Sequence, residues 1–320
     1  MRLALHVAAA LLLGSNGSLA AEAYPSRPIR VVVGFPAGSA NDFIARTIGQ
    51  RLSETYGQQV VVDNRPGAGA LIASQIVGKA LADGYTFGLV GQSHVANTLL
   101  HVPPPYDLFR DFSSVAFVAS MPNVIVIGNN VGAKTVPELI ALAKAKPGAL
   151  NFASGGVGSS SHLAGETMVA AAGIKAVHVP FKSFADIFGE AMSGRVHFFV
   201  FPTAAAMPML GDGKLRAIAV AAPSRVSALP DVPTTAEAKF PEFTFDAWNG
   251  IVVPAGVPKP LITKISSDIA KSVQQRDVQE RLERQGAQAR YLSPDEFEKL
   301  QRSDHARLGK LIAQLGIARK

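Results

Sequence analysis

Serine and histidine side chains could supply a nucleophile and a base, but their spacing in this chain matches no common catalytic motif. Ser93 and His94 stand together in "GQSHV", where Val95 replaces the second glycine of a nucleophile elbow. Ser160 lies two residues before His162, but proximity in sequence does not create a Ser–His pair in space. No histidine has a metal-ligand spacing such as H-E-x-x-H, and the chain contains no cysteine. We therefore expect no enzyme, metal site or cofactor, with a hydrolase using Ser93 or Ser160 as the weaker alternative.

A second motif, at residues 124–135, is similar to a phosphate-binding loop but departs from it at one position. In "VIVIGNNVGAKT", Ala133 stands where the loop requires glycine, and alanine does not readily adopt a positive φ. Thr135 followed by Glu138 fits a capping box instead, so we expect a helix here and no nucleotide site.

Short polar loops recur where the predicted strands end. They lie at residues 35–42, 91–94, 154–162, 180–183 and 201–203. Ligands of open parallel sheets bind outside the carboxyl ends of the strands, where helix N-termini present free N–H groups and partial positive charge. One such loop is only a helix cap, but several loops of one type favour a shared cleft for a carboxylate.

The elements that must position these loops alternate between strands and helices. The expected strands are residues 29–33, 60–62, 86–90, 115–119, 124–127, 151–153, 176–179, 196–200 and 217–221. Such alternation predicts an α/β fold with mostly parallel sheets flanked by helices. The C-terminal part is helical, with apolar residues four apart over 261–273 and a capping box formed by Ser293 and Glu296.

Bulk properties indicate a globular chain that begins with an export signal. The 320 residues suffice for two domains, and 17% charged residues is ordinary for a folded protein. The apolar run at 3–13, followed by Ala21 and Ala23, predicts a signal peptide over residues 1–23. The net charge of +7 comes from scattered basic residues, which favours anionic small molecules and not nucleic acid as partners.

Several blocks of sequence resemble Bug-type solute receptors, the periplasmic receptors of tripartite tricarboxylate transporters. They include "YPSRPIRVVVGFPAGSANDFIAR", "VVDNRPGAGALIA", "NFASGGVGSSSHLAGE", "HVPFKS" and "ALPDVPTTAE". The resemblance implies a two-lobed periplasmic binding protein fold (type II), in which each lobe is a mostly parallel sheet flanked by helices and the cleft lies between the lobes. One lobe would comprise residues 24–122 plus 246–320 and the other residues 123–245, joined by crossings at "SMPNVIVIG" and "FDAWNGIVV".

The same resemblance places the ligand-binding residues in the polar loops. They are Phe35, Ala37, Gly38, Ser39, Asn41, Asp42, Ser93, His94, Ser154, Gly155, Gly158, Ser159, Ser160, His162, Phe181, Lys182, Phe201, Pro202 and Thr203. Asp42 fits a first-turn helix acid better than a ligand contact, and Lys182 fits a cleft edge and a solvated loop equally well. Relatives commonly carry Asp at the position of Phe201, where it can pair with a ligand amine. Phe201 cannot do so, which predicts a ligand without an amine and with apolar or aromatic character beside its carboxylate.

The resemblance implies a function as well as a fold. A periplasmic monomer would capture a small carboxylate in the cleft and deliver it to the membrane permease subunits of a tripartite transporter. A receptor that presents its bound ligand to a membrane signalling partner needs the same cleft, so that alternative stays open.

Overall fold

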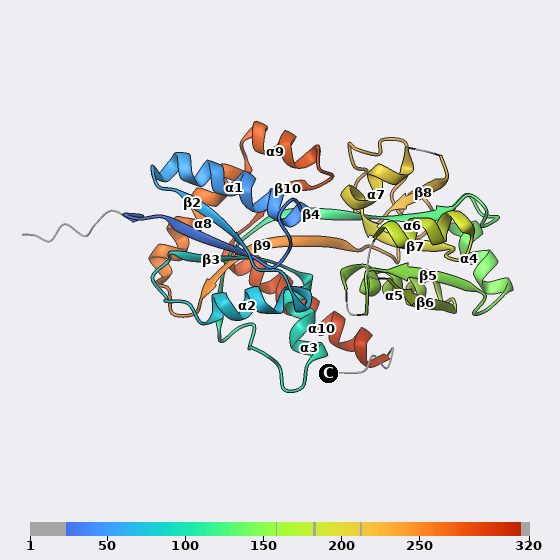
Figure 1. Cartoon of the computed structure of the whole chain (residues 1–320), viewed down its shortest axis with the longest axis horizontal. Coiled ribbons are helices and arrows are strands. Elements are labelled where there is room, and N and C mark those ends of the chain that lie inside the picture. Colours follow the sequence, from blue (N-terminus) through green and yellow to red (C-terminus); the bar gives the residue numbers. More distant parts are fainter. Residues whose placement is uncertain (1–23, 158, 182–183, 212, 315–320) are drawn as a thin grey trace, which may run out of the picture.

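The computed structural model describes residues 24–157, 159–181, 184–211 and 213–314, so the expected signal peptide at residues 1–23 lies outside the described residues. Helices flank a curled sheet that runs through two lobes (Figure 1). In chain order the elements are β1 (Ile29–Val33), α1 (Ala40–Tyr56), β2 (Val60–Asn64), the short 3-10 helix η1 (Ala68–Ala70), α2 (Leu71–Gly78), β3 (Thr86–Gly91), α3 (Gln92–Leu100), β4 (Phe112–Gly128), α4 (Val136–Ala145), β5 (Leu150–Ser154), α5 (Ser160–Ala172), β6 (Ala176–Pro180), α6 (Phe184–Ser193), β7 (Phe198–Pro202), α7 (Thr203–Leu210), β8 (Leu215–Val220), β9 (Asp246–Pro254), α8 (Lys259–Val273), α9 (Arg276–Glu283), β10 (Gln288–Leu292) and α10 (Pro294–Gln314).

The sheet is mixed, whereas the sequence predicted mostly parallel strands. Parallel pairing holds β2 to β1 and β1 to β3 in the first lobe, and β6 to β5 and β5 to β7 in the second. The strands β4 and β9 pair antiparallel with each other and with their other neighbours. The reason is that the chain leaves the first lobe along β4 and returns along β9, so each crossing strand meets neighbours that run the other way.

The long strand β4 belongs to both lobes. It pairs with β9 as far as Pro122, opposite Asp246, and with β7 from Asn123, opposite Pro202. The separate strands expected at 115–119 and 124–127 are therefore one. Pro122 has no N–H to donate, but it lies where β4 changes partner and so at the end of a ladder.

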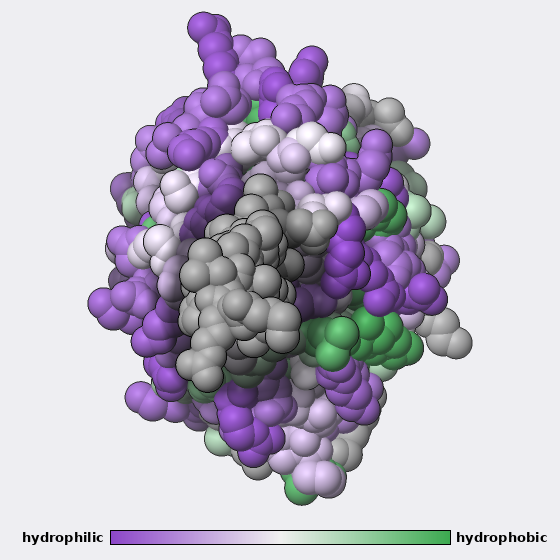
Figure 2. Space-filling view, turned by 90° about the vertical axis from the view of Figure 1, so that its left-hand side faces the viewer, coloured by the Kyte–Doolittle hydropathy of each residue, from purple (hydrophilic) through white to green (hydrophobic). Residues whose placement is uncertain are grey.

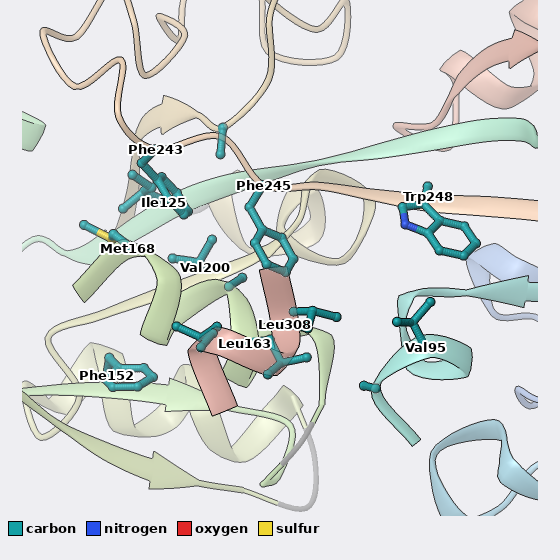
Figure 3. Close-up of a cluster of buried hydrophobic side chains, with 14 of the residues drawn as sticks. Val95, Ile125, Phe152, Leu163, Met168, Val200, Phe243, Phe245, Trp248 and Leu308 are labelled. Atoms are coloured by element: carbon teal, nitrogen blue, oxygen red, sulfur yellow. The ribbon is translucent and has the colours of Figure 1, made fainter. Parts of the chain in front are cut away.

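Apolar side chains fill both faces of the sheet. In the first lobe α1 buries Ile44, Ile48 and Leu52, and α8 buries Ile265 and Ile269, against the strands. On the other face one apolar cluster continues through both lobes. It contains Val95 and Trp248, then Leu308 of α10, then Phe245, Leu163, Met168, Ile125, Val200, Phe243 and Phe152 (Figure 3).

Two predicted helix caps are confirmed. Thr135 accepts a hydrogen bond from the Glu138 N–H, and the Glu138 carboxylate accepts one from the Lys134 N–H. Ser293 donates through its N–H and its hydroxyl to Glu296, at the start of α10. The loop before α4 is thus a helix start, as expected, and its polar groups are used for capping.

The end of the molecule that carries β1 and β2 presents mainly hydrophilic residues outside the grey atoms, with hydrophobic residues in a small group (Figure 2). Side chains there pair by charge, as Arg27 does with Asp83 and Arg30 with Asp63. Within the described ranges, no helix is both long and apolar enough to cross a bilayer.

Candidate functional site

Helices α1, α3, α5 and α7 all begin just after the carboxyl end of a strand. The strands β1 and β3 are parallel neighbours in the first lobe, and β5 and β7 are parallel neighbours in the second. Parallel neighbours end at the same edge of a sheet, so the helices that follow them start side by side. The polar loops predicted from the sequence are the connections before these helices.

The loop before α1 is held by its own side chains. Gly38 has a φ of 81°, a conformation that favours glycine, and Ser39 caps α1 by accepting from the Asp42 N–H at 3.2 Å. Ala37 and Gly38 are exposed, whereas Phe35 is half-buried and packs on the first-lobe core. The exposed backbone of this loop is therefore accessible to a ligand, while the Phe35 ring anchors the loop to the core.

Asp42 is buried and bound within the first lobe. Its carboxylate accepts hydrogen bonds from the Gly38 N–H, the Asn64 amide and the Arg46 guanidinium, each at 2.9 Å. Burial alone would raise the pKa of Asp42, but these hydrogen bonds outweigh burial and hold the pKa below its usual range. Its side chain is thus fully engaged in holding the loop.

Helix α3 places Gln92 3.4 Å from Ser160 of the second lobe and turns His94 into the core. His94 is buried, and its Nδ1 shares a hydrogen bond of 2.9 Å with the Ser74 hydroxyl. Its ring stacks on Tyr106. Burial lowers the pKa of His94 to about 3, so its imidazole is neutral. Ser93 is half-buried and lines the same small cavity as His94 and Ser74.

The loop before α5 forms a compact hydrogen-bonded turn. Ser159 caps the helix by accepting from the His162 N–H at 3.2 Å, and the Gly155 N–H donates to Ser161 at 3.0 Å. Ser154, which is fully buried, exchanges hydrogen bonds with Gly156, whose φ of 113° favours glycine. Ser160, half-buried at the first helical position, is left pointing toward the first lobe.

Two stacked imidazoles lie behind this turn. The ring centres of His162 and His178 are 3.9 Å apart, His178 contacts the Ser154 hydroxyl at 2.6 Å, and His162 lies 3.5 Å from the Glu166 carboxylate. Burial and then the neighbouring His162 lower the pKa of His178 to about 4, and Glu166 acts weakly in the other direction. His178 is consequently neutral near pH 7 and adds no charge to the site.

The start of α7 lies further along the same edge of the second lobe. Thr203 is fully buried and donates its hydroxyl to the Pro122 carbonyl at 2.7 Å, and Pro202 is half-buried beside it. Phe201 is fully buried in an apolar cluster with Phe199, and Phe181 packs partly buried against that cluster. The remaining predicted residues, Gly158 and Lys182, lie outside the described residues.

Contacts between the lobes bring three of these helix starts together. The Ser160 hydroxyl of α5 lies 3.4 Å from the Gln92 Oε1 of α3, which joins the second lobe to the first. The Asn41 amide of α1 donates at 2.6 Å to Asn249 of the crossing strand β9. Gly91, which caps α3, lies opposite Asn249 in the pairing of β3 with β9. We call this meeting point of the first turns of α1, α3 and α5 with Asn249 the shared site.

Sequence reasoning missed Asn249 and Gln92. Asn249 is a lone polar residue in an apolar strand and is fully buried. The run "AWNGIVV" predicts a crossing segment, and the polar residue within it is a further signal, because a buried polar group needs a partner. Gln92 was overlooked between a glycine and the Ser93–His94 pair.

The shared site is suited to an anion. Helix N-termini carry unpaired N–H groups and a partial positive charge, and serine hydroxyls and asparagine amides add donors. Among the described residues, no group of three or more histidine or carboxylate side chains could hold a metal ion. The arrangement can bind and orient a carboxylate, and in the Ser–His contacts at Ser74 and Ser154 the serine is buried.

Comparison with known proteins agrees with this chemistry. The model of the tripartite tricarboxylate transporter family receptor matches residues 44–317. The protein BugT of Bordetella pertussis is 32% identical over 285 residues, which cover 88% of this chain and 87% of BugT.

Solved structures show the same fold. The R. palustris protein Rpa4515, solved with adipate, superposes with a TM-score of 0.79 at 32% identity, over 92% of this chain and 99% of that one. MatC from Rhodopseudomonas palustris, solved with bound malate, superposes with a TM-score of 0.75 at 28% identity, over 90% of this chain and 100% of MatC.

Proposed function

Because the chain belongs to the tripartite tricarboxylate transporter receptor family, we propose that it captures a small carboxylate in the shared site and delivers it to a membrane permease. Receptors of this family are periplasmic solute-binding proteins and not enzymes, as the sequence predicted. The observation that carries the proposal is the meeting of three helix starts from two lobes. Asn41 of α1 bonds to Asn249, Gly91 at the start of α3 lies opposite Asn249, and Ser160 of α5 contacts Gln92 of α3. Adipate and malate, bound by two relatives, define the size of solute to test first.

The proposed ligand has no amine. The two carboxylates described beside the shared site are engaged, Asp42 by Arg46 and Asn64 and Glu166 by His162. An ammonium enclosed there would lose its hydration without gaining an anionic partner, which costs several kcal/mol. Phe201, at a position where relatives commonly carry Asp, is fully buried in the second-lobe core and supplies no anionic partner.

The proposed division into lobes follows the change of partner along β4. Residues 24–122 plus 246–320 form one lobe and residues 123–245 the other, with residues 1–23 removed on export. Two crossing connections permit hinge closure around a ligand. In this proposal the receptor acts as a monomer, and its closed form is what the permease subunits recognise.

A melting-temperature screen tests the proposal. The mature protein, purified from the periplasm of an expression host, is heated with adipate, malate, succinate, benzoate, aspartate and glutamate, and with the matched amides. At 100 times its dissociation constant a true ligand adds about 2.7 kcal/mol to the free energy of unfolding. A stabilisation by amides equal to that by acids would overturn carboxylate capture, and the largest shift with aspartate or glutamate would overturn the absence of an amine.

A further inference from the structure

Asn249 contains a buried hydrogen-bond donor without a partner. The residue is fully buried, and its Oδ1 accepts from the Asn41 amide at 2.6 Å. Its Nδ2 has no hydrogen-bond partner among the described residues. Leaving a buried donor unpaired is costly, so a native protein retains one where another molecule satisfies it or where strain is useful.

The orientation of the Asn249 amide is fixed through its oxygen. The nitrogen and oxygen of one amide are about 2 Å apart, so Nδ2 lies within reach of the first turn of α1, to which Oδ1 is bonded. The same oxygen lies 4.0 Å from the Cβ position of Gly91, where α3 begins without a side-chain cap. A Cβ on Gly91 would lie 2.9 Å from the Trp248 carbonyl oxygen, so glycine there lets the start of α3 approach β9 closely. The oxygen is thus fixed between the first turn of α1 and the start of α3, and Nδ2, on the other corner of the amide, is the donor left without an acceptor among the described residues.

This inference rests on the proposed function and names one of its contacts. We infer that Asn249 Nδ2 donates a hydrogen bond to the carboxylate of the bound solute. Asn41 is the positioning residue, because its hydrogen bond keeps the Asn249 oxygen turned away from that carboxylate. A carboxylate accepts from Nδ2 and from the helix ends at once, whereas an uncharged amide ligand would bring further N–H groups into a region already rich in donors. Asn249 therefore favours the binding of a carboxylate over the binding of the matching amide.

Asn249→Asp is the decisive variant because it is isosteric. It keeps an oxygen to accept from Asn41 and replaces only the N–H that faces the ligand. The introduced carboxylate is itself stabilised by the helix N-termini, which favours a folded protein. We expect the dissociation constant to rise at least about 100-fold for the acid probe, through the lost charge-assisted hydrogen bond and the new repulsion.

The measurement is isothermal titration with the acid that gives the largest melting shift in the wild type, and with its amide. The wild type prefers the acid, and in Asn249→Asp the preference collapses or reverses, a change of selectivity that a purely structural role of Asn249 would not produce. Asn151→Asp, which loses one amide hydrogen bond to the Arg195 carbonyl at the opposite end of β5, is the control and keeps wild-type affinity.

Each outcome has one meaning. If the wild type binds acids and Asn249→Asp binds them within about threefold, the inference is overturned and the proposed function stands. If the wild type binds no acid, both fail. Should Asn249→Asp not fold, Asn41→Ala on the half-buried first turn of α1 frees the Asn249 amide to rotate, and we then expect about tenfold weaker binding; unchanged binding by this variant also overturns the inference.

Discussion

Whether the contact of a single residue could be predicted depends on how far away its partner lies in the sequence. The hydroxyls of Ser39 and Ser159 each accept a hydrogen bond from the N–H three residues later and so cap a helix. Such short-range pairs could be predicted from the sequence. Asn41 and Asn249 are 208 positions apart, so nothing in either segment alone announces their contact. His94 shows the same limit, because it follows the polar residues Gln92 and Ser93 in sequence while its ring packs against Tyr106 and Phe112 in space.

His94 makes stability depend on pH. Its pKa is about 3 in the folded chain and near 6.5 when unfolded, so the unfolded state binds more protons between these values. Stability is therefore lost as the pH falls below about 6.5, by roughly 2–3 kcal/mol at pH 4.5 from this residue. In urea titrations we expect His94→Phe to reduce the slope of unfolding free energy against pH over this range.

The matched control for this prediction is Ser74→Ala. It removes the hydrogen bond at 2.9 Å to His94 but keeps the buried imidazole, so it lowers stability by about 1 kcal/mol and retains the slope. A slope as steep in His94→Phe as in the wild type would show that other groups carry the acid sensitivity.

Among the elements, the strands and caps with a strong local signal were predicted best. The strand at Ile29–Val33 is confirmed residue for residue, because a β-branched run between turns has few alternatives. The strand β10 (Gln288–Leu292) was not expected, since "QARYL" contains no β-branched residue; its conformation comes from pairing with β4. The antiparallel orientation of β9 could not be predicted from the sequence either, because it depends on pairing with β3 and β4, which lie far away in the chain.

Helix α5 allows stability and binding to be separated. Ser159→Ala removes the cap that accepts from the His162 N–H and should cost about 1 kcal/mol. Ser159→Asp keeps a capping oxygen and should restore most of that stability, while its charge at the start of α5 repels a carboxylate and weakens its binding. Chemical denaturation and titration calorimetry measure the two effects, and equal affinity in Ser159→Asp and the wild type would place α5 outside the binding surface.

At the scale of the whole molecule, one apolar cluster continues through both lobes, which predicts that they unfold as a single cooperative unit. Leu308 of α10 is fully buried and lies beside Leu163 of α5 and Phe245 near the crossing (Figure 3). A two-lobed fold could be expected from the sequence, but a C-terminal helix that packs on both lobes could not, because its apolar face does not identify its partner.

Leu308→Ala should therefore destabilise the entire protein by about 2–5 kcal/mol and lower the melting temperature without splitting the transition. Leu81→Ala, at a side chain that is 77% exposed, is the matched control and should leave the melting temperature almost unchanged. Differential scanning calorimetry that resolves two transitions in the wild type would contradict the idea of one cooperative unit.

The pairing of β3 with β9 has a consequence for the order of assembly. While the chain is being completed, β1, β2 and β3 can associate early, but the free edge of β3 waits for residues that come about half the chain later. An unpaired edge is a template for joining another chain, and contacts so distant in sequence form slowly. The interval before β9 arrives is thus the period of greatest aggregation risk, and a periplasmic chaperone that shields β3 would raise the yield of native receptor.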